Sequence, residues 1–260
     1  MFFQVSKNSK SSIVCNIPHS STKIPSKFLK SYLLSKKDLK FETFSLSDLY
    51  TDILFKRIYK NTNYILSKIS RILVDIERFE NENEEPMAKV GMAALYTKTQ
   101  YGKVLRKIDA KEREFLVKNI YQKYHQDFTK LVQNCLVKND KCLIIDCHSF
   151  PSTARQYESD KEDNRPDICI GSDGFHTPKN IVSNLKENFE TLGYSVKINS
   201  PFAGSIVPSD YYKKDKRISS VMIEVNRKLY MDEKTFKKTK NFKKVESDIY
   251  KVIKLIIENS

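Results

Sequence analysis

Two histidines follow apolar segments in a chain that has only four histidines. His148 lies near the end of the run 143–149 (LIIDCHS), and His19 follows the run 13–17 (IVCNI). A buried strand that delivers Asp, His and Ser at its carboxyl end is typical of α/β enzymes, which keep reactive groups at that edge of the sheet. Two such histidines together favour one shared metal site, although a structural role for each histidine stays open.

A hydrolytic zinc site needs three protein ligands and one open position for water, so one ligand remains to be found. Asp52 is the favoured carboxylate because it lies in the first turns of a predicted helix that follows the His19 segment. Asp146 precedes His148 by two residues and shares its strand face, so it can be a ligand or can orient an imidazole. The other candidates are Asp48, Asp75, His125 and His176.

A carboxylate in the apolar run 221–225 (VMIEV) is the candidate for the base that activates water. An ionised Glu224 in the middle of a buried strand is costly unless it has a partner or a task. Beside a metal, a raised pKa would let Glu224 take a proton from water and give it to a leaving amine. A salt bridge to Arg227 or to a lysine is the structural alternative.

Two arginines, Arg71 and Arg78, flank the apolar run 72–76 (ILVDI). Arg78 follows the predicted strand end, where a guanidinium can hold a substrate carboxylate through two parallel hydrogen bonds. An ion pair of Arg78 with Asp75 or Glu77 is equally compatible with the sequence.

Strand-like runs alternate with amphipathic segments along the chain, which predicts an α/β fold with a mixed, mostly parallel sheet flanked by helices. The expected strands are residues 12–17, 64–66, 72–76, 142–146, 168–171, 195–198 and 220–225. The expected helices are residues 46–59, a segment within 107–138, 178–192 and 241–258. No repeat or linker interrupts this pattern, so we expect a single domain over residues 1–260.

Two polar, charged stretches, residues 79–90 and 151–166, are expected to be surface loops. Loops of this length between well-formed elements often cover active sites. The second loop contains Arg155, which adds a candidate substrate-binding side chain.

The composition limits which classes of binding partner and which cellular location we expect for this protein. The formal net charge is +14, but the densest basic stretches are not interleaved with aromatics as in a nucleic-acid module. We therefore expect a solvated basic surface, which can still steer a small anionic substrate, and no nucleic-acid partner. No apolar run is long enough to span a bilayer, and the five cysteines fit buried thiols better than disulfides. The expected location is the cytoplasm, with no membrane contact and no secretory signal.

Two other function classes remain to be weighed. A Cys or Ser hydrolase is disfavoured because Cys147 should face away from Asp146 and His148, and no nucleophile-elbow glycines surround Ser149. A binding protein that keeps the fold without catalysis should have lost a ligand or the base, yet a candidate for each is present.

The segments together resemble the N-formylglutamate amidohydrolase family, in order and over nearly the whole chain. The matching segments are 17–20 (IPHS) with 24–25 (IP), 51–52 (TD) with 58–59 (IY), 71–78 (RILVDIER), 95–96 (LY), 124–125 (YH), 146–149 (DCHS), 166–171 (PDICIG), 201–204 (PFAG) and 224–231 (EVNRKLYM). The order and spacing of these motifs carry the resemblance, since no single motif does so alone.

The resemblance implies a three-layer fold akin to zinc carboxypeptidases and metal-assisted hydrolysis of an N-acyl amide on an acidic amino acid. The implied ligands of one Zn²⁺ per chain, or of another divalent metal, are His19, Asp52 and His148, and the implied base is Glu224. The implied substrate-binding residues are Arg78, Ser149, Arg155, Phe202 and Gly204. Asp75 and Asp146 would support the ligands, and His125 would polarise the scissile carbonyl or orient a substrate carboxylate.

The chain departs from the family pattern at Ser21, Glu77, Ser205 and Pro208. These positions lie in or near the segments expected to face the substrate, whereas the implied ligands and base are retained. The departures leave open which small anionic N-acyl amino acid, or peptide-like amide, is the substrate. The oligomeric state also stays open.

Overall fold

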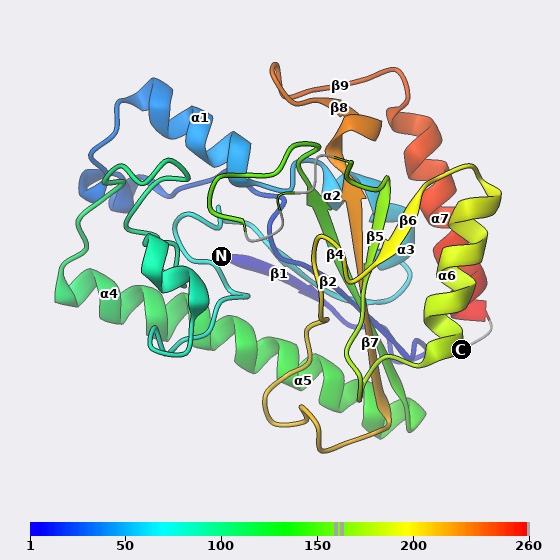
Figure 1. Cartoon of the computed structure of the whole chain (residues 1–260). Helices are drawn as coiled ribbons and strands as arrows, with labels where there is room; N and C mark the ends of the chain where they lie inside the picture. Colours follow the sequence, from blue (N-terminus) through cyan, green and yellow to red (C-terminus); the bar gives the residue numbers. More distant parts are fainter. Residues whose placement is uncertain (159–160, 162–163, 259–260) are drawn as a thin grey trace.

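The computed structural model describes residues 1–158, 161 and 164–258, and within them seven strands form one sheet (Figure 1). The strands are β1 (Phe3–Ser6), β2 (Ile13–Ile17), β3 (Asn63–Ser67), β4 (Cys142–Phe150), β5 (Ile168–Gly171), β6 (Val196–Ile198) and β7 (Ile218–Asn226). Their order is β1-β3-β2-β4-β7-β5-β6. The four central strands β3, β2, β4 and β7 are parallel, whereas β1 and β5 each join the sheet antiparallel. The predicted mixed, mostly parallel sheet is confirmed.

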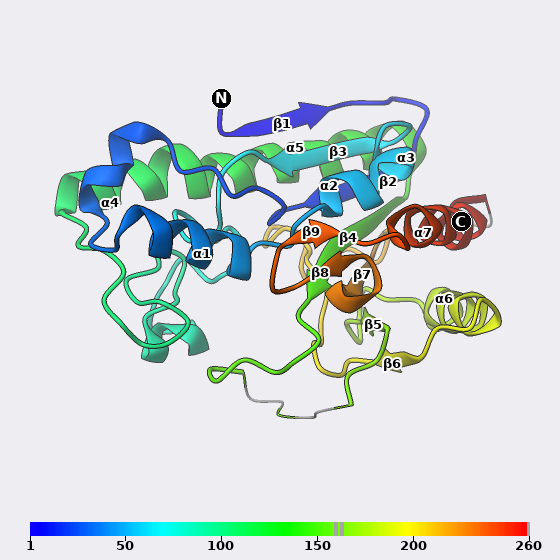
Figure 2. The same cartoon turned by 90° about the horizontal axis from the view of Figure 1, so that it is seen from above.

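Helices cover both faces of the sheet (Figure 2). The helices are α1 (Lys36–Leu46), α2 (Thr51–Leu54), α3 (Lys56–Tyr59), α4 (Ala110–Leu116), α5 (Gln122–Asn139), α6 (Lys179–Thr191) and α7 (Phe242–Glu258), and a π-helical turn (Val117–Tyr121) joins α4 to α5. One core packs α5 against the sheet, and a second core packs α2, α3, α6 and α7 against the opposite face. The predicted three-layer arrangement is therefore confirmed. No helix in the described part of the chain is long and apolar enough to cross a membrane.

The two cores show which way the side chains of β4 point. Ile144 belongs to the core under α5, whereas Ile145 and Cys147 belong to the core on the opposite face. Because side chains alternate along a strand, Asp146 and His148 share the face of Ile144. Cys147 thus points away from His148, as expected from the sequence, and β4 delivers an acid and an imidazole to one side of the sheet.

The predicted helix over residues 46–59 is correct only in its second part, where α2 and α3 cover residues 51–54 and 56–59. Helix α1 ends at Leu46, and Tyr50 adopts a left-handed conformation (φ 71°) before the short helices α2 and α3 begin. Leu49, Leu54 and Ile58 are buried as expected, and Ile53 is partly buried, but the chain turns sharply between residues 47 and 50. Because of this turn, Asp48 lies beside the strand ends, and the residues of the following helix α2 do not.

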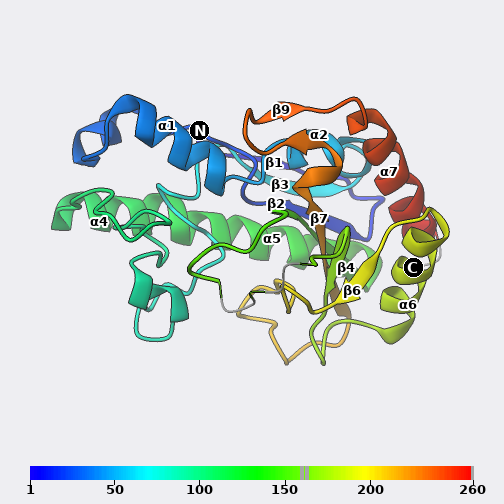
Figure 3. The same ribbon diagram turned by 45° about the horizontal axis from the view of Figure 1, so that its top comes forward.

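The predicted strand over residues 72–76 is also wrong, because this buried segment forms turns. Its backbone finds partners outside any sheet: the Arg106 guanidinium donates to the Leu73 carbonyl at 2.7 Å, and the Asp75 amide donates to the Ala94 carbonyl at 2.8 Å. Such bonds satisfy buried backbone groups without a strand ladder. Together with α1, the region between β3 and α4 extends from the sheet on the side opposite to α6 and α7 (Figure 3).

Candidate active site

His19 lies two residues beyond the end of β2, and its residue surface is only 1% exposed. Its Nε2 atom lies 2.9 Å from Asp75 Oδ1. Its backbone carbonyl accepts a hydrogen bond from the Asp48 amide at 2.9 Å. The Nδ1 atom is buried and has no hydrogen-bond partner among the described residues. One ring nitrogen of His19 is therefore held by a carboxylate, and the other is free to bind a ligand.

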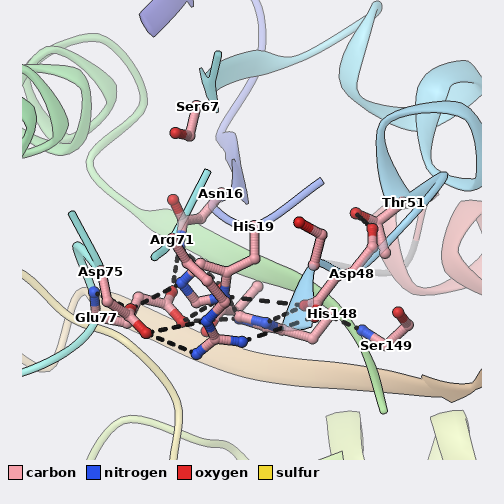
Figure 4. Close-up of polar contacts among 12 residues, drawn as sticks. Asn16, His19, Asp48, Thr51, Ser67, Arg71, Asp75, Glu77, His148 and Ser149 are labelled. Atoms are coloured by element: carbon pink, nitrogen blue, oxygen red, sulfur yellow. Dashed lines mark hydrogen bonds and ion pairs between the residues drawn. The ribbon is translucent and has the colours of Figure 1, made fainter. Parts of the chain in front are cut away.

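His148 is held in a similar way (Figure 4). Its Nε2 atom lies 2.9 Å from Asp146 Oδ1, and its Nδ1 atom lies 3.0 Å from Asp48 Oδ2. The centroids of the two imidazole rings are 5.3 Å apart. Burial of the His148 ring opposes its protonation and lowers its pKa. The negative charges of Asp146 and Glu77 outweigh burial, so the pKa of His148 lies well above its usual range.

The two Nδ1 atoms converge on one carboxylate oxygen. Asp48 Oδ2 lies 3.0 Å from Nδ1 of His148 and 3.9 Å from Nδ1 of His19. Ligands that bind zinc at about 2.0–2.1 Å in a tetrahedral arrangement lie roughly 3.4 Å from one another, between these two distances. The three residues fulfil the geometric requirement for a cation site, since one ligand atom of each lies within 4.8 Å of the others.

Asp48 reaches this position through the turn between α1 and α2. The Ser47 hydroxyl donates to the Thr43 carbonyl and closes α1, and the Asp48 carbonyl accepts from the Thr51 amide at the start of α2. Arg227 Nη2 lies 3.0 Å from Asp48 Oδ1. Burial opposes ionisation of this acid, but the hydrogen bond with His148 and the nearby positive charges hold its pKa below the usual range.

The structure corrects the expectation for Asp52, which does not join the two histidines. Asp52 lies in the first turn of α2, beyond the left-handed Tyr50, and is half-buried. Burial raises its pKa, and the charges that oppose this rise are those of nearby lysines. The sequence offered both Asp48 and Asp52 as carboxylates, but only the unpredicted turn decides between them.

Glu224 stands beside His148, because the two residues are partners in the parallel ladder between β7 and β4. Its carboxylate is almost wholly buried, and its Oε2 atom has no hydrogen-bond partner among the described residues. Burial raises the pKa of Glu224 to about 8. The structural alternative, a salt bridge with Arg227, does not form between these two residues, since Arg227 binds Asp48 instead. Glu224 thus presents an unengaged oxygen next to the histidine pair.

A cavity of about 430 Å³ opens over these groups. It is lined by His19, Asp48, His148 and Glu224, by the arginines Arg71, Arg78, Arg155 and Arg227, and by Ser149, Tyr157 and Phe202 among others. The structure therefore brings most of the predicted site residues to one cavity, on loops and strand ends that are far apart in the sequence.

The four arginines of the cavity differ in how far they are already engaged. Arg71 makes two hydrogen bonds to Asp75 Oδ2, at 2.8 and 3.0 Å, and Arg155 donates to Gln100 at 2.8 Å. Arg78 lies 3.6 Å from Asp75, and its buried Nε atom has no hydrogen-bond partner among the described residues. Arg78 thus keeps the most donor capacity for an anionic ligand.

Besides Asp52 and the supporting acids Asp75 and Asp146, two predicted residues lie outside this cavity, namely His125 and Gly204. His125 lines a neighbouring cavity of about 780 Å³, and its Nε2 atom lies 2.8 Å from the Ile76 carbonyl. His125 lies on α5 and does not line the cavity of the two histidines, although Glu77 and Arg78 border both cavities. Gly204 lines a second neighbouring cavity, together with Glu77 and Asp146.

Sequence reasoning missed how three charged residues are used. Arg71 was noted only as a flanking residue, yet it neutralises Asp75, the partner of His19. The sequence suggests Arg227 as a partner for Glu224 and Glu77 as a partner for Arg78. In the structure Arg227 binds Asp48, and Glu77 Oε2 lies 3.1 Å from His148 Nε2. Charged residues beside buried apolar runs were the available signal, but their partners depend on turns that the sequence does not reveal.

A family model of N-formylglutamate amidohydrolase matches residues 11–231. The crystal structure of N-formylglutamate amidohydrolase from Ralstonia eutropha JMP134 is similar with a TM-score of 0.87 at 19% sequence identity, over 99% of this chain and 98% of that chain. A gene product of Agrobacterium tumefaciens is similar with a TM-score of 0.67 at 18% identity, over 98% of this chain and 96% of that chain.

These two structures share the fold, and a search of curated protein sequences finds no match. The family model covers the segments that supply both histidines, Asp48 and Glu224. Because the match spans most of the sequence, the chain belongs to the N-formylglutamate amidohydrolase family.

Proposed function

We propose that this protein hydrolyses the amide bond of a small N-acyl amino acid with an acidic side chain, in a reaction that depends on a divalent metal ion. The observation that carries the proposal is the convergence of the Nδ1 atoms of His19 and His148 on Asp48, while a buried carboxylate holds each Nε2 atom. Metal-binding histidines commonly donate their second N–H to a carboxylate in this way.

The residues present fit a metal ion in two respects. The buried Nδ1 atom of His19 has no hydrogen-bond partner among the described residues. An unpaired buried polar atom costs free energy unless a ligand binds to it. Two imidazoles and one carboxylate are also the donor set that catalytic zinc commonly uses. When bound, the ion would polarise a carbonyl oxygen and lower the pKa of water.

Glu224 is the proposed general base. Its Oε2 atom would accept a proton from the attacking water and deliver that proton to the amine nitrogen as the amide bond breaks. The oxygen has no competing partner among the described residues, and it lies on the same face of the sheet as His148. Burial keeps water around this carboxylate scarce, which strengthens its interaction with the reacting groups.

Arg78 is the proposed anion clamp for a carboxylate of the substrate. Its guanidinium borders the cavity with donors that are not engaged by close hydrogen bonds. Arg155 and Ser149 line the same cavity and would add polar contacts. Phe202, which packs edge-on against Phe150 at a centroid distance of 5.8 Å, would contact the apolar part of the substrate.

The test is a hydrolysis assay on protein stripped by a chelator and then reconstituted with zinc, cobalt or manganese. The substrates are N-formylglutamate, N-acetylglutamate and N-formylleucine. We expect turnover only in reconstituted protein, with the acidic substrates preferred. No turnover by any reconstituted form, or turnover that the chelator leaves unchanged, would contradict the proposal.

A further inference from the structure

We propose that Glu77 is a positioning residue that shares the Nε2–H group of His148 with Asp146 and thereby sets how tightly the site holds a divalent cation. This inference rests on the cation site of the proposed function. It concerns an acid at a position where the sequence departs from its family pattern.

Two carboxylates lie against the same ring nitrogen. Asp146 Oδ1 is 2.9 Å from His148 Nε2, and Glu77 Oε2 is 3.1 Å from it. A neutral imidazole carries one N–H group, and a cation at Nδ1 leaves that hydrogen on Nε2. Both acids therefore accept from a single donor, so that each can replace part of what the other supplies.

Glu77 is held in this position by a polar network and is not a free surface acid. Asn16 Nδ2 donates to Glu77 Oε1 at 2.7 Å and to Asp146 Oδ1 at 2.9 Å, so one amide joins the two carboxylates. The Tyr124 hydroxyl donates in turn to Asn16 Oδ1. The Glu77 side chain is 17% exposed. The network fixes the Glu77 carboxylate next to the His148 ring. An acid that moved freely would interact with the ring much more weakly.

The arrangement strengthens cation binding for two physical reasons. Carboxylates that accept the N–H group of a ligating histidine make the imidazole more basic and fix its orientation. Glu77 Oε2 also lies 3.8 Å from the unpartnered Nδ1 atom of His19, so its negative charge stands close to the converging ligands. Removal of such a supporting group typically weakens metal affinity by about 10–100-fold.

A second arrangement of the same residues is geometrically available, because Glu77, Asp146 and His148 also lie close enough to hold a cation among themselves. That arrangement would leave the buried Nδ1 atom of His19 without a partner and would use the Nε2 atom that two acids already contact. We therefore place the cation on the Nδ1 side and give Glu77 the supporting role. The variant His19→Ala separates the two, since His19 supplies a ligand atom only on the Nδ1 side.

The experiment measures the zinc dissociation constant by competition with a chromophoric chelator. The proteins are the wild type, Glu77→Gln, Asp146→Asn, the double variant, Glu80→Gln and His19→Ala. Glu80 lies three residues away and accepts from Gln122, so its variant removes the same charge from the same loop. The apo thermal unfolding temperature of each protein shows whether the substitution disturbs the fold.

We expect Glu77→Gln to weaken zinc binding roughly 10–100-fold and Glu80→Gln to leave it within about twofold. In the double variant the loss should exceed the product of the two single losses, because each single variant keeps one acceptor. If Glu77→Gln does not fold, Glu77→Asp keeps the charge but shortens its reach, and its zinc affinity should still fall.

The outcomes separate this inference from the proposed function. Zinc binding by the wild type that is equally tight in Glu77→Gln, or equally weakened in Glu80→Gln, would overturn the role of Glu77 and leave the cation site standing. Unchanged binding in His19→Ala would place the cation on the other side of the ring and would also overturn it. A wild type that binds no zinc would overturn both proposals.

Discussion

The candidate site has two halves that are built in different ways. His148, Asp146 and Glu224 lie on the neighbouring strands β4 and β7, where ladder hydrogen bonds set the position of every side chain. Asp48 and Arg78 come from turns outside the sheet. The strand half depends on backbone pairing, whereas the loop half depends on side chains that bind one another.

The difference shows in what each half needs to keep its shape. On the strands, a substitution removes one functional group and leaves the backbone ladder in place. In the loop half, Arg71 holds Asp75, and Asp75 holds His19, so one substitution can shift several groups. We therefore expect clean, single-function losses from the strands and coupled effects from the loops.

The largest effect is expected on the strand half, from His148→Ala. Loss of one of three proposed ligands should abolish zinc binding, because one imidazole and one carboxylate are fewer than the three protein ligands that a catalytic zinc site needs. Zinc content measured by elemental analysis after reconstitution checks this. The matched control His125→Ala removes an imidazole outside the cavity and should keep the zinc. Full zinc content in His148→Ala would remove this residue from the ligand set.

Glu224→Gln should lower kcat by about 10²–10⁴-fold, the usual contribution of a general base. Its zinc content and unfolding temperature should stay close to those of the wild type, since the ladder around the residue is unchanged. Steady-state kinetics on the best N-acyl substrate measures this effect. An unchanged kcat would exclude Glu224 as the base.

Asp48→Asn tests the loop half directly and should weaken zinc binding by about 10²-fold, because an amide is a poorer ligand than a carboxylate. It should also disturb Arg227, which loses its ion-pair partner. Asp52→Asn is the control, from the next helical turn, and should leave the zinc affinity unchanged. The reverse ranking of these two variants, measured by chelator competition, would restore the assignment that the sequence favoured.

The smallest effect is expected from Arg78→Ala. It should raise the KM for acidic substrates by about 10-fold or somewhat more, as for a lost hydrogen bond to a charged group, with little change in kcat. Neutral N-acyl amino acids should be much less affected. Equal increases in KM for acidic and neutral substrates would exclude a carboxylate clamp at this position.

The same division explains how much could be predicted from the sequence. The apolar run before His148 and the run around Glu224 predict buried strands, and the period of two then sets which side chains share a face. The placement of His148, Asp146 and Glu224 on one face follows from that regularity. The predicted bounds of the next two strands of the sheet, β2 and β3, also agree with the structure to within one or two residues.

The loop half could not be predicted, because its geometry depends on single conformations and distant partners. The left-handed Tyr50 breaks a segment whose apolar spacing reads as one helix, and this break exchanges Asp52 for Asp48. Arg106 and Ala94, which are distant along the chain, bind the backbone of Leu73 and Asp75, so this buried run forms turns where its apolar pattern favoured a strand. Neither the left-handed Tyr50 nor the distant partners of residues 72–76 can be recognised from a pattern in the neighbouring sequence.

The most direct test of this account is the position of a bound metal ion. Anomalous diffraction from crystals grown with zinc would locate it without any assumption about activity. The account predicts one peak in contact with Nδ1 of His19, Nδ1 of His148 and the Asp48 carboxylate. A peak among Glu77, Asp146 and Nε2 of His148, or no peak in fully reconstituted protein, would contradict it.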